Sequence, residues 1–211
     1  ILCMLELEDG SFYAGTDGAG IYHIKDKEII GHIGKEEGLS SQVVMRITEY
    51  EDGFFVVSGT SLCYLQDGMV KELVEFPYYN NYDVIVLEDS LCVLASAGVY
   101  LADAGQLISG EAVSCKLYNY SNGLEDGLTS NAWNYVDEEG VLYFASNSGV
   151  YYCNPTNMTE ERVDYKFSLA SVMYDGVPVK PENGVYQIPA DAEVITLVGS
   201  VRNYLCTNVK I

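Results

Sequence analysis

The sequence predicts an all-β fold, and three observations support this prediction. Short apolar and aromatic runs recur along the chain, and each is bounded by Gly, Asp, Asn or Ser, as strands usually are. No segment repeats its apolar residues with the helical period of about 3.6 residues. The composition, 48% hydrophobic and 12% aromatic, is that of a chain that can bury a core. We therefore expect a folded, almost wholly β protein.

The expected strands are organised around four acidic turns of similar sequence. In each copy an acidic pair precedes a turn residue, an apolar run follows, and a small residue ends the run. The copies are "EDGSFYAGT" at 8–16, "EDGFFVVSG" at 51–59, "EDSLCVLASA" at 88–97 and "DEEGVLYFASN" at 137–147. Their turn residues, Gly10, Gly53, Ser90 and Gly140, are separated by 43, 37 and 50 residues. Repeats of this size that contain only short strands are typical of propeller blades.

The repeats therefore predict a partial β-propeller of about four blades, each with four antiparallel strands, over residues 1–155. In the second blade the expected strands are 42–50, 53–58, 61–67 and 69–74. The stretch "GTDGAG" at 15–20 is interpreted as a hairpin turn, because no helix follows that would offer its N-terminal amides to a phosphate. We expect the first strand of each blade to be innermost and the blades to form an open arc.

The steps between blades contain a second repeated motif. "EEGLSSQVV" at 36–44 and "EDGLTSNAW" at 125–133 match closely. Together with the acidic turns, they resemble the two-component regulator propeller repeat, and the resemblance covers about residues 1–155. The chain departs from that repeat by placing other residues near its usual Trp, namely Phe12, Phe54, Cys92 and Tyr143.

A second region follows a polar stretch at 156–164, which is interpreted as a linker. Residues 165–211 contain strand-like runs around turn residues at Asp175 and Gly176 and at 181–184. This region resembles the start of the Y-Y-Y β-sandwich domain that follows such propellers. We expect an incomplete β-sandwich here, and we expect the whole chain to be a piece of a longer protein.

The two resemblances imply a sensor. They imply the extracytoplasmic ligand-sensing region, periplasmic or at the cell surface, of a bacterial membrane-bound signalling protein with a histidine kinase, hybrid two-component or diguanylate cyclase output. The region itself is then non-catalytic, its ligand is a small molecule or an oligosaccharide, and the parent protein is membrane-spanning and homodimeric. Two alternatives stay open: a propeller enzyme, such as a lyase or glycosidase, and a propeller that only binds other proteins.

Charge and motifs exclude several other classes. The formal net charge of −20 argues against nucleic-acid binding, because an acidic surface repels phosphate backbones. His23 and His32 have no carboxylate motif between them and are interpreted as solvated residues. The acidic turns lack the dense carboxylate spacing of calcium loops, and the six cysteines contain no C-x-x-C pair and are interpreted as buried free thiols. We therefore expect no cofactor, no metal and no catalytic residue.

The candidate ligand site lies where polar residues precede the expected innermost strands. Those strands converge on the axis of a propeller, so the residues before them surround the mouth of its channel. Aromatic faces stack on sugar or nucleobase rings, and amides hydrogen-bond to hydroxyl groups. The candidate ligand-binding residues are Ser41, Gln42, Tyr79, Asn80, Asn81, Tyr82, Ser130, Asn131 and Trp133.

Overall fold

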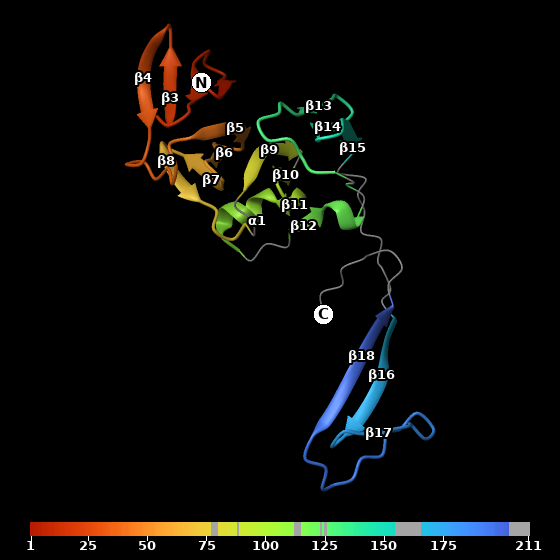
Figure 1. Ribbon diagram of the computed structural model, residues 1–211. Helices are drawn as coiled ribbons and strands as arrows, with labels where there is room; N and C mark the ends of the chain where they lie inside the picture. Colours follow the sequence, from red (N-terminus) through yellow and green to blue (C-terminus); the bar gives the residue numbers. More distant parts are fainter. Residues whose placement is uncertain are drawn as a thin grey trace. The chain divides into compact units, whose positions relative to one another are not determined.

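The computed structural model describes residues 1–76, 80–87, 89–111, 115–122, 124, 126–154 and 166–202 (Figure 1). The chain divides into two compact units, Ile1–Thr159 and Glu160–Ile211. The regular secondary structure in the described parts of both units is almost entirely antiparallel strand, which confirms the predicted all-β class. The expected linker at 156–164 lies outside the described residues.

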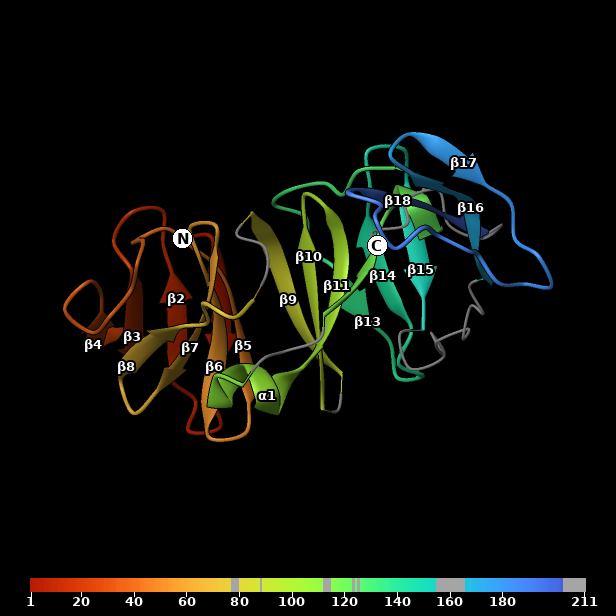
Figure 2. The ribbon, with the colours of Figure 1, turned by 90° about the horizontal axis from the view of Figure 1, so that it is seen from below.

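The described residues of the N-terminal unit form four sheets, and in each sheet the strands are paired in chain order (Figure 2). The first sheet consists of β1 (Cys3–Glu6), β2 (Phe12–Gly15), β3 (Ile21–Lys25) and β4 (Glu28–Ile33). The second consists of β5 (Val44–Tyr50), β6 (Gly53–Ser58), β7 (Ser61–Gln66) and β8 (Met69–Glu72). The third consists of β9 (Asn81–Leu87), β10 (Ser90–Ala95), β11 (Gly98–Asp103) and β12 (Lys116–Tyr118). The fourth has three described strands, β13 (Tyr135–Val136), β14 (Leu142–Ala145) and β15 (Val150–Cys153).

The first three sheets have the four strands and the strand order predicted for blades, whereas the fourth has three described strands, and the described sheets form an open series. In the second sheet every strand begins and ends within two residues of its predicted bounds. The first strands of consecutive sheets contact one another, β1 with β5 and β5 with β9, as expected of innermost strands. The periodic turns of the sequence therefore located the strands of this unit closely.

Two of the turns show why their sequences favour hairpins. Asp67 and Gly68, between β7 and β8, both have positive φ angles of 52° and 76°. Two consecutive residues with positive φ are what a type I′ turn requires, and this turn matches the twist of paired strands. The segment at 15–20 joins the paired strands β2 and β3, which confirms the predicted hairpin. A Cβ atom at Gly20 would lie 2.2 Å from the carbonyl oxygen of Ile33, so only glycine fits there.

A short helix, α1 (Ala104–Ser109), interrupts the third sheet between β11 and β12. Its N-terminus is capped by the Asp103 side chain, which accepts a hydrogen bond from the backbone N–H of Gln106. Its C-terminus is capped by Gly110 in the left-handed region. The sequence pattern predicts no helix here. The helix lies within the longest of the three turn-to-turn spacings, the 50 residues from Ser90 to Gly140, which contains more residues than the strands of one repeat need.

The core of the N-terminal unit consists of three buried clusters, each shared by two neighbouring sheets. Val56 of β6 packs in the cluster shared with the first sheet, whereas Phe55 and Val57 pack in the cluster shared with the third sheet. Cys92 and Leu94 of β10 pack in the cluster shared with the fourth sheet. Because these strands are buried on both faces, their sequences are continuous apolar runs rather than alternating ones.

The described cysteines differ in burial. Cys3, Cys63 and Cys92 are buried, Cys115 and Cys153 are partly exposed, and all five carry free thiols. Cys206 lies outside the described residues. Burial raises the pKa of the Cys63 thiol to about 12, so at neutral pH almost none of it is the reactive thiolate.

We therefore expect two phases when the native protein reacts with a thiol reagent such as dithionitrobenzoate. The partly exposed Cys115 and Cys153 should react in the fast phase, and the buried thiols should react only when the protein unfolds. Mass spectrometry of labelled peptides assigns each phase to its residues. Fast labelling of Cys63 in the native protein would contradict the packing between the first and second sheets.

The C-terminal unit contains one described sheet with the strand order β17–β16–β18. Its strands are β16 (Lys166–Tyr174), β17 (Val177–Val179) and β18 (Ile195–Arg202). The turn predicted at Asp175 and Gly176 joins β16 to β17, and the Asp175 side chain accepts hydrogen bonds from the backbone N–H groups of Glu193 and Val194. The turn predicted at 181–184 is also present, closed by a bridge between Glu182 and Val185.

Candidate functional site

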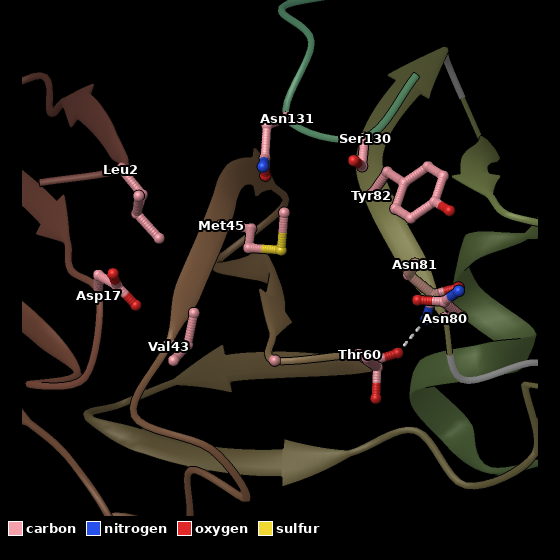
Figure 3. A pocket seen from close by; sticks show the side chains of 11 residues that line it. Leu2, Asp17, Val43, Met45, Thr60, Asn80, Asn81, Tyr82, Ser130 and Asn131 are labelled. Carbon is pink, nitrogen blue, oxygen red and sulfur yellow. Dashed lines mark hydrogen bonds between the residues drawn. The ribbon is translucent and has the colours of Figure 1, made fainter. Parts of the chain in front are cut away.

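The N-terminal unit has a pocket of about 490 Å³ among the first strands of its second and third sheets (Figure 3). Val43 and Met45 line it from the start of β5, and Gly59 and Thr60 line it from the turn between β6 and β7. The remaining lining residues come from the N-terminus, from the turn after β2, from the start of β9 and from the segment before β13, and they are Leu2, Asp17, Asn80, Asn81, Tyr82, Ser130 and Asn131.

The pocket brings together five of the nine residues proposed from the sequence, namely Asn80, Asn81, Tyr82, Ser130 and Asn131. Trp133 lines an adjoining recess of about 250 Å³ that shares Leu2, Met45, Tyr82 and Asn131 with the pocket. Tyr79 lies outside the described residues. Two polar pairs that precede innermost strands, one before β9 and one before β13, therefore reach the same cavity.

Ser41 and Gln42 are not among the residues that line the pocket. The backbone N–H of Ser41 donates a hydrogen bond to Ser58 Oγ at 3.2 Å, and Ser58 Oγ donates in turn to the Ser41 carbonyl at 2.6 Å. The carbonyl of Gln42 accepts hydrogen bonds from the backbone N–H groups of Gly18 and Gly20. This segment thus connects the first and second sheets, and Asp17 and Val43 occupy the pocket wall instead.

Asn81 provides an unpaired acceptor at the pocket. The residue is 1% exposed, and its Nδ2 donates a hydrogen bond to the Thr60 carbonyl at 3.0 Å (Figure 3). Among the described residues, no donor reaches its Oδ1, which is buried. A buried polar atom without a partner costs about 1–3 kcal/mol. Because this oxygen is enclosed by protein, a ligand O–H or N–H group can donate to it only after the Asn81 side chain or its neighbours shift.

A buried ion pair lies directly beside the pocket. Arg46 of β5 donates from Nε to Asp83 Oδ1 at 2.5 Å and from Nη2 to Asp83 Oδ2 at 3.1 Å. Asn134 Nδ2 donates to Asp83 Oδ2 at 2.6 Å, and the backbone N–H of Val84 donates to Asp83 Oδ1 at 2.8 Å. Burial raises the pKa of Asp83, while the Arg46 guanidinium and the hydrogen bonds from Asn134 and Val84 act in the opposite direction. Since all four contacts are donors, they are made by the ionised carboxylate.

Arg46 and Asp83 are not among the residues proposed from the sequence. Each is a charged residue with an apolar or aromatic residue on either side in a first strand, "VMRITEY" for β5 and "NYDVIVL" for β9. A charge at such a position is rarely buried unless it is paired, and that was the signal available in the sequence. Their pairing across 37 residues was not readable from either strand alone.

Trp133 is the single tryptophan of the chain and is 69% exposed. The Arg46 guanidinium carbon lies 4.0 Å from the centre of its ring, within the range of a cation–π interaction. The guanidinium thus covers one face of the indole. The exposed remainder offers a flat apolar surface beside the pocket for a ring of a ligand.

The two histidines do not form a catalytic arrangement with the residues they contact. His23 is half-buried, and its Nε2 lies 2.8 Å from Ser11 Oγ, which lies 2.5 Å from Asp9 Oδ1. In a Ser-His-Asp triad the histidine stands between the other two residues, whereas here the serine does, and Ser11 is fully buried. His32 is exposed in β4, as expected, but the half-burial of His23 differs from the predicted solvated position.

In the described part of the chain, no group of three or more His, Cys, Asp or Glu side chains is placed to hold a metal ion. No helix there has the length and apolar character needed to cross a membrane.

Comparison with known proteins identifies relatives in structure only. No family model matches the chain, and no curated protein matches it. The extracellular domain of the putative hybrid two component system BT3049 from B. thetaiotaomicron superposes with a TM-score of 0.63 at 15% identity, over 92% of this chain and 26% of that one. Two structures of the BT4673 extracellular domain from B. thetaiotaomicron, described as a putative one component and a putative hybrid two component system, give TM-scores of 0.54 and 0.55 at 13% identity. They cover 84% and 86% of this chain and 22% and 23% of theirs.

The chain therefore has the fold of these extracellular domains and spans about a quarter of their length. These neighbours agree with the resemblance to bacterial two-component sensor regions that the repeats predicted. At this level of identity the likeness establishes the fold.

Proposed function

We propose that the chain is part of the extracytoplasmic ligand-sensing region of a bacterial membrane-bound signalling protein. The observation that carries this proposal is the fold, which is shared over 92% of the chain with the extracellular domain of a putative hybrid two component system. The region is non-catalytic and lies in the periplasm or at the cell surface. Its parent protein is membrane-spanning and homodimeric, with a histidine kinase, hybrid two-component or diguanylate cyclase output.

We place the ligand in the pocket at Asn80, Asn81, Ser130 and Asn131. Its polar groups are mainly amides, hydroxyls and backbone, with Asp17 as its acidic residue, in a chain of net charge −20. Such a site repels anions and favours a neutral or cationic ligand rich in O–H or N–H groups. The exposed indole of Trp133 supports a ligand with a ring, such as an oligosaccharide or another ring-bearing small molecule.

Ligand binding would act on the packing of the sheets. The pocket takes residues from the second sheet, the third sheet and the segment that leads to the fourth. A ligand that contacts all of them favours the relative packing in which its contacts are best, which is a shift between existing populations. No chemical step is needed for the signal.

Binding is tested with the intact sensor region and a panel of probes. The panel contains neutral oligosaccharides of glucose, xylose, arabinose and mannose, the nucleosides adenosine and cytidine, and oligogalacturonate as the anionic counterpart. A neutral ring-bearing probe is expected to change the emission of Trp133 and to raise the unfolding temperature, and oligogalacturonate is expected to do neither. If no probe changes either signal, a ligand of this class in this pocket is contradicted.

Asn131 is the sharpest residue for testing the site. Its φ angle is +58°, which glycine adopts freely, so Asn131→Gly removes the amide without straining the backbone. We expect this change to make the binding free energy of the probe less favourable by about 1–3 kcal/mol, because groups of the probe lose their hydrogen bond to the Asn131 amide. Asn183→Gly in the C-terminal unit, where φ is 49°, is the matched control and should leave affinity unchanged. Calorimetric titration measures both.

Asn81 is less suitable for this purpose. Asn81→Ala would also remove the hydrogen bond from Nδ2 to Thr60, which joins β9 to the turn of the neighbouring sheet. A loss of affinity in that variant would combine the lost ligand contact with lost stability. For Asn131→Gly, an affinity equal to that of the wild type would contradict a ligand site at this wall of the pocket.

A further inference from the structure

The segment 130–134 contacts both the pocket and the buried ion pair. Ser130 and Asn131 line the pocket, and Trp133 lines the adjoining recess. The Ala132 carbonyl accepts a hydrogen bond from Arg46 Nη2 at 3.0 Å. Asn134 donates to Asp83. One short segment therefore connects the ligand cavity to the Arg46–Asp83 pair.

Two first strands place each member of the ion pair next to a pocket residue. Met45 of β5 lines the pocket, and the next residue is Arg46. Tyr82 of β9 lines the pocket, and the next residue is Asp83. The ion pair thus lies beside the pocket wall, with its side chains 11% and 3% exposed, and Arg46 also lines the recess next to Trp133.

Arg46 contacts the middle of the segment 130–134, and β14 contacts the chain at both of its ends. Just before the segment, the Thr129 N–H donates to the Ala145 carbonyl at 3.0 Å. At its last residue, Asn134 Oδ1 accepts a hydrogen bond from the Ala145 N–H at 3.1 Å. For residues 130–133, the contact with Arg46 Nη2 is the hydrogen bond found within the described part of the chain. The same guanidinium covers the ring of Trp133.

We propose that Arg46, oriented by Asp83, is the positioning residue of the pocket: it fixes the segment 130–134 so that Asn131 and Trp133 line the cavity. This inference rests on the proposed function for its biological meaning, because it concerns the same site. Asp83 contributes by fixing both nitrogens of the guanidinium, which leaves Nη2 directed at the Ala132 carbonyl. Pocket occupancy and the integrity of this network are then coupled, and the coupling is reciprocal.

The experiment uses the intact chain without ligand, at a temperature where every variant is folded, and its readouts are acrylamide quenching and emission anisotropy of Trp133. The variants are Arg46→Met, Arg46→Lys and Asp83→Asn. Arg46→Met removes a charge-assisted hydrogen bond to the Ala132 carbonyl and a cation–π contact with Trp133, so the quenching constant of Trp133 should rise and its anisotropy should fall. Arg46→Lys keeps the charge but loses the forked donors and the planar stacking, so it should restore wild-type behaviour only in part.

Two references separate positioning from general destabilisation. Circular dichroism at the same temperature shows that each variant is folded, so a change at Trp133 reports the segment and not unfolding of the unit. Lys25→Met, which removes the exposed ion pair between Lys25 and Asp9 in the first sheet, should leave Trp133 quenching unchanged. If the quenching and anisotropy of Trp133 in folded Arg46→Met equal those of the wild type, the proposal is overturned.

Failure of this inference is distinguishable from failure of the proposed function. The readouts need no ligand, so a chain that binds none of the probes can still show the change at Trp133 in Arg46→Met. That outcome supports the positioning role and contradicts the proposed ligand. Binding of a probe with unchanged quenching and anisotropy of Trp133 in the variants supports the site and overturns the role of Arg46.

Discussion

Replacing Phe55 by Ala is expected to lower the free energy of unfolding of the N-terminal unit by about 3–5 kcal/mol. Phe55 is 0% exposed in the cluster between the second and third sheets. Its ring lies 5.5 Å from that of Tyr50 and 5.2 Å from that of Tyr64. Truncation removes the buried ring and leaves a cavity between two sheets, and each sheet is held by its own strand pairing and closes the gap only partly.

Denaturant unfolding followed by Trp133 emission measures this loss, because the single tryptophan of the chain lies in the N-terminal unit. Met69→Ala in β8 is the control, since Met69 is 59% exposed and its truncation should change stability by no more than about 0.5 kcal/mol. A loss below about 1 kcal/mol for Phe55→Ala would show that the sheets do not pack through this residue.

Asp83→Ala is expected to destabilise the same unit by about 3–5 kcal/mol, for an electrostatic reason. The change leaves the Arg46 guanidinium buried without its counter-ion and leaves Asn134 Nδ2 without its acceptor. Solvent does not compensate, because the two side chains are 11% and 3% exposed. The comparison pair, Lys25 with Asp9 at 2.7 Å, has side chains that are 40% and 55% exposed, and Lys25→Met should have no measurable effect on unfolding.

A double variant tests the origin of that loss. Arg46→Met combined with Asp83→Ala removes both charges, so it should be more stable than Asp83→Ala alone. The unfolding transitions of the wild type, Arg46→Met, Asp83→Ala and this double variant give the coupling energy of the pair. Additive losses in the two single variants and the double variant would contradict a direct interaction between Arg46 and Asp83.

The local features of the sequence were sufficient for the strands and turns. The acidic turns and apolar runs located β5 to β8 within two residues, because hairpin turns and buried strands depend on residues close in the chain. The same periodicity selected Asn80, Asn81, Ser130 and Asn131, since the position before a first strand is equivalent in each repeat. It did not predict α1, which occupies an insertion that the repeat does not specify.

The partners across sheets were decided by the tertiary structure. Ser41 and Gln42 occupy the equivalent position before β5, yet they bond to Ser58 and to the turn after β2 instead of lining the pocket. Asp83 meets Arg46 and Asn134 across 37 and 51 residues. The sequence by itself determined the repeat, the β class and the polar positions before the first strands. How the sheets stack, and therefore which polar side chain finds a protein partner and which faces the pocket, depends on packing between segments far apart in the chain, about which a local pattern carries no information.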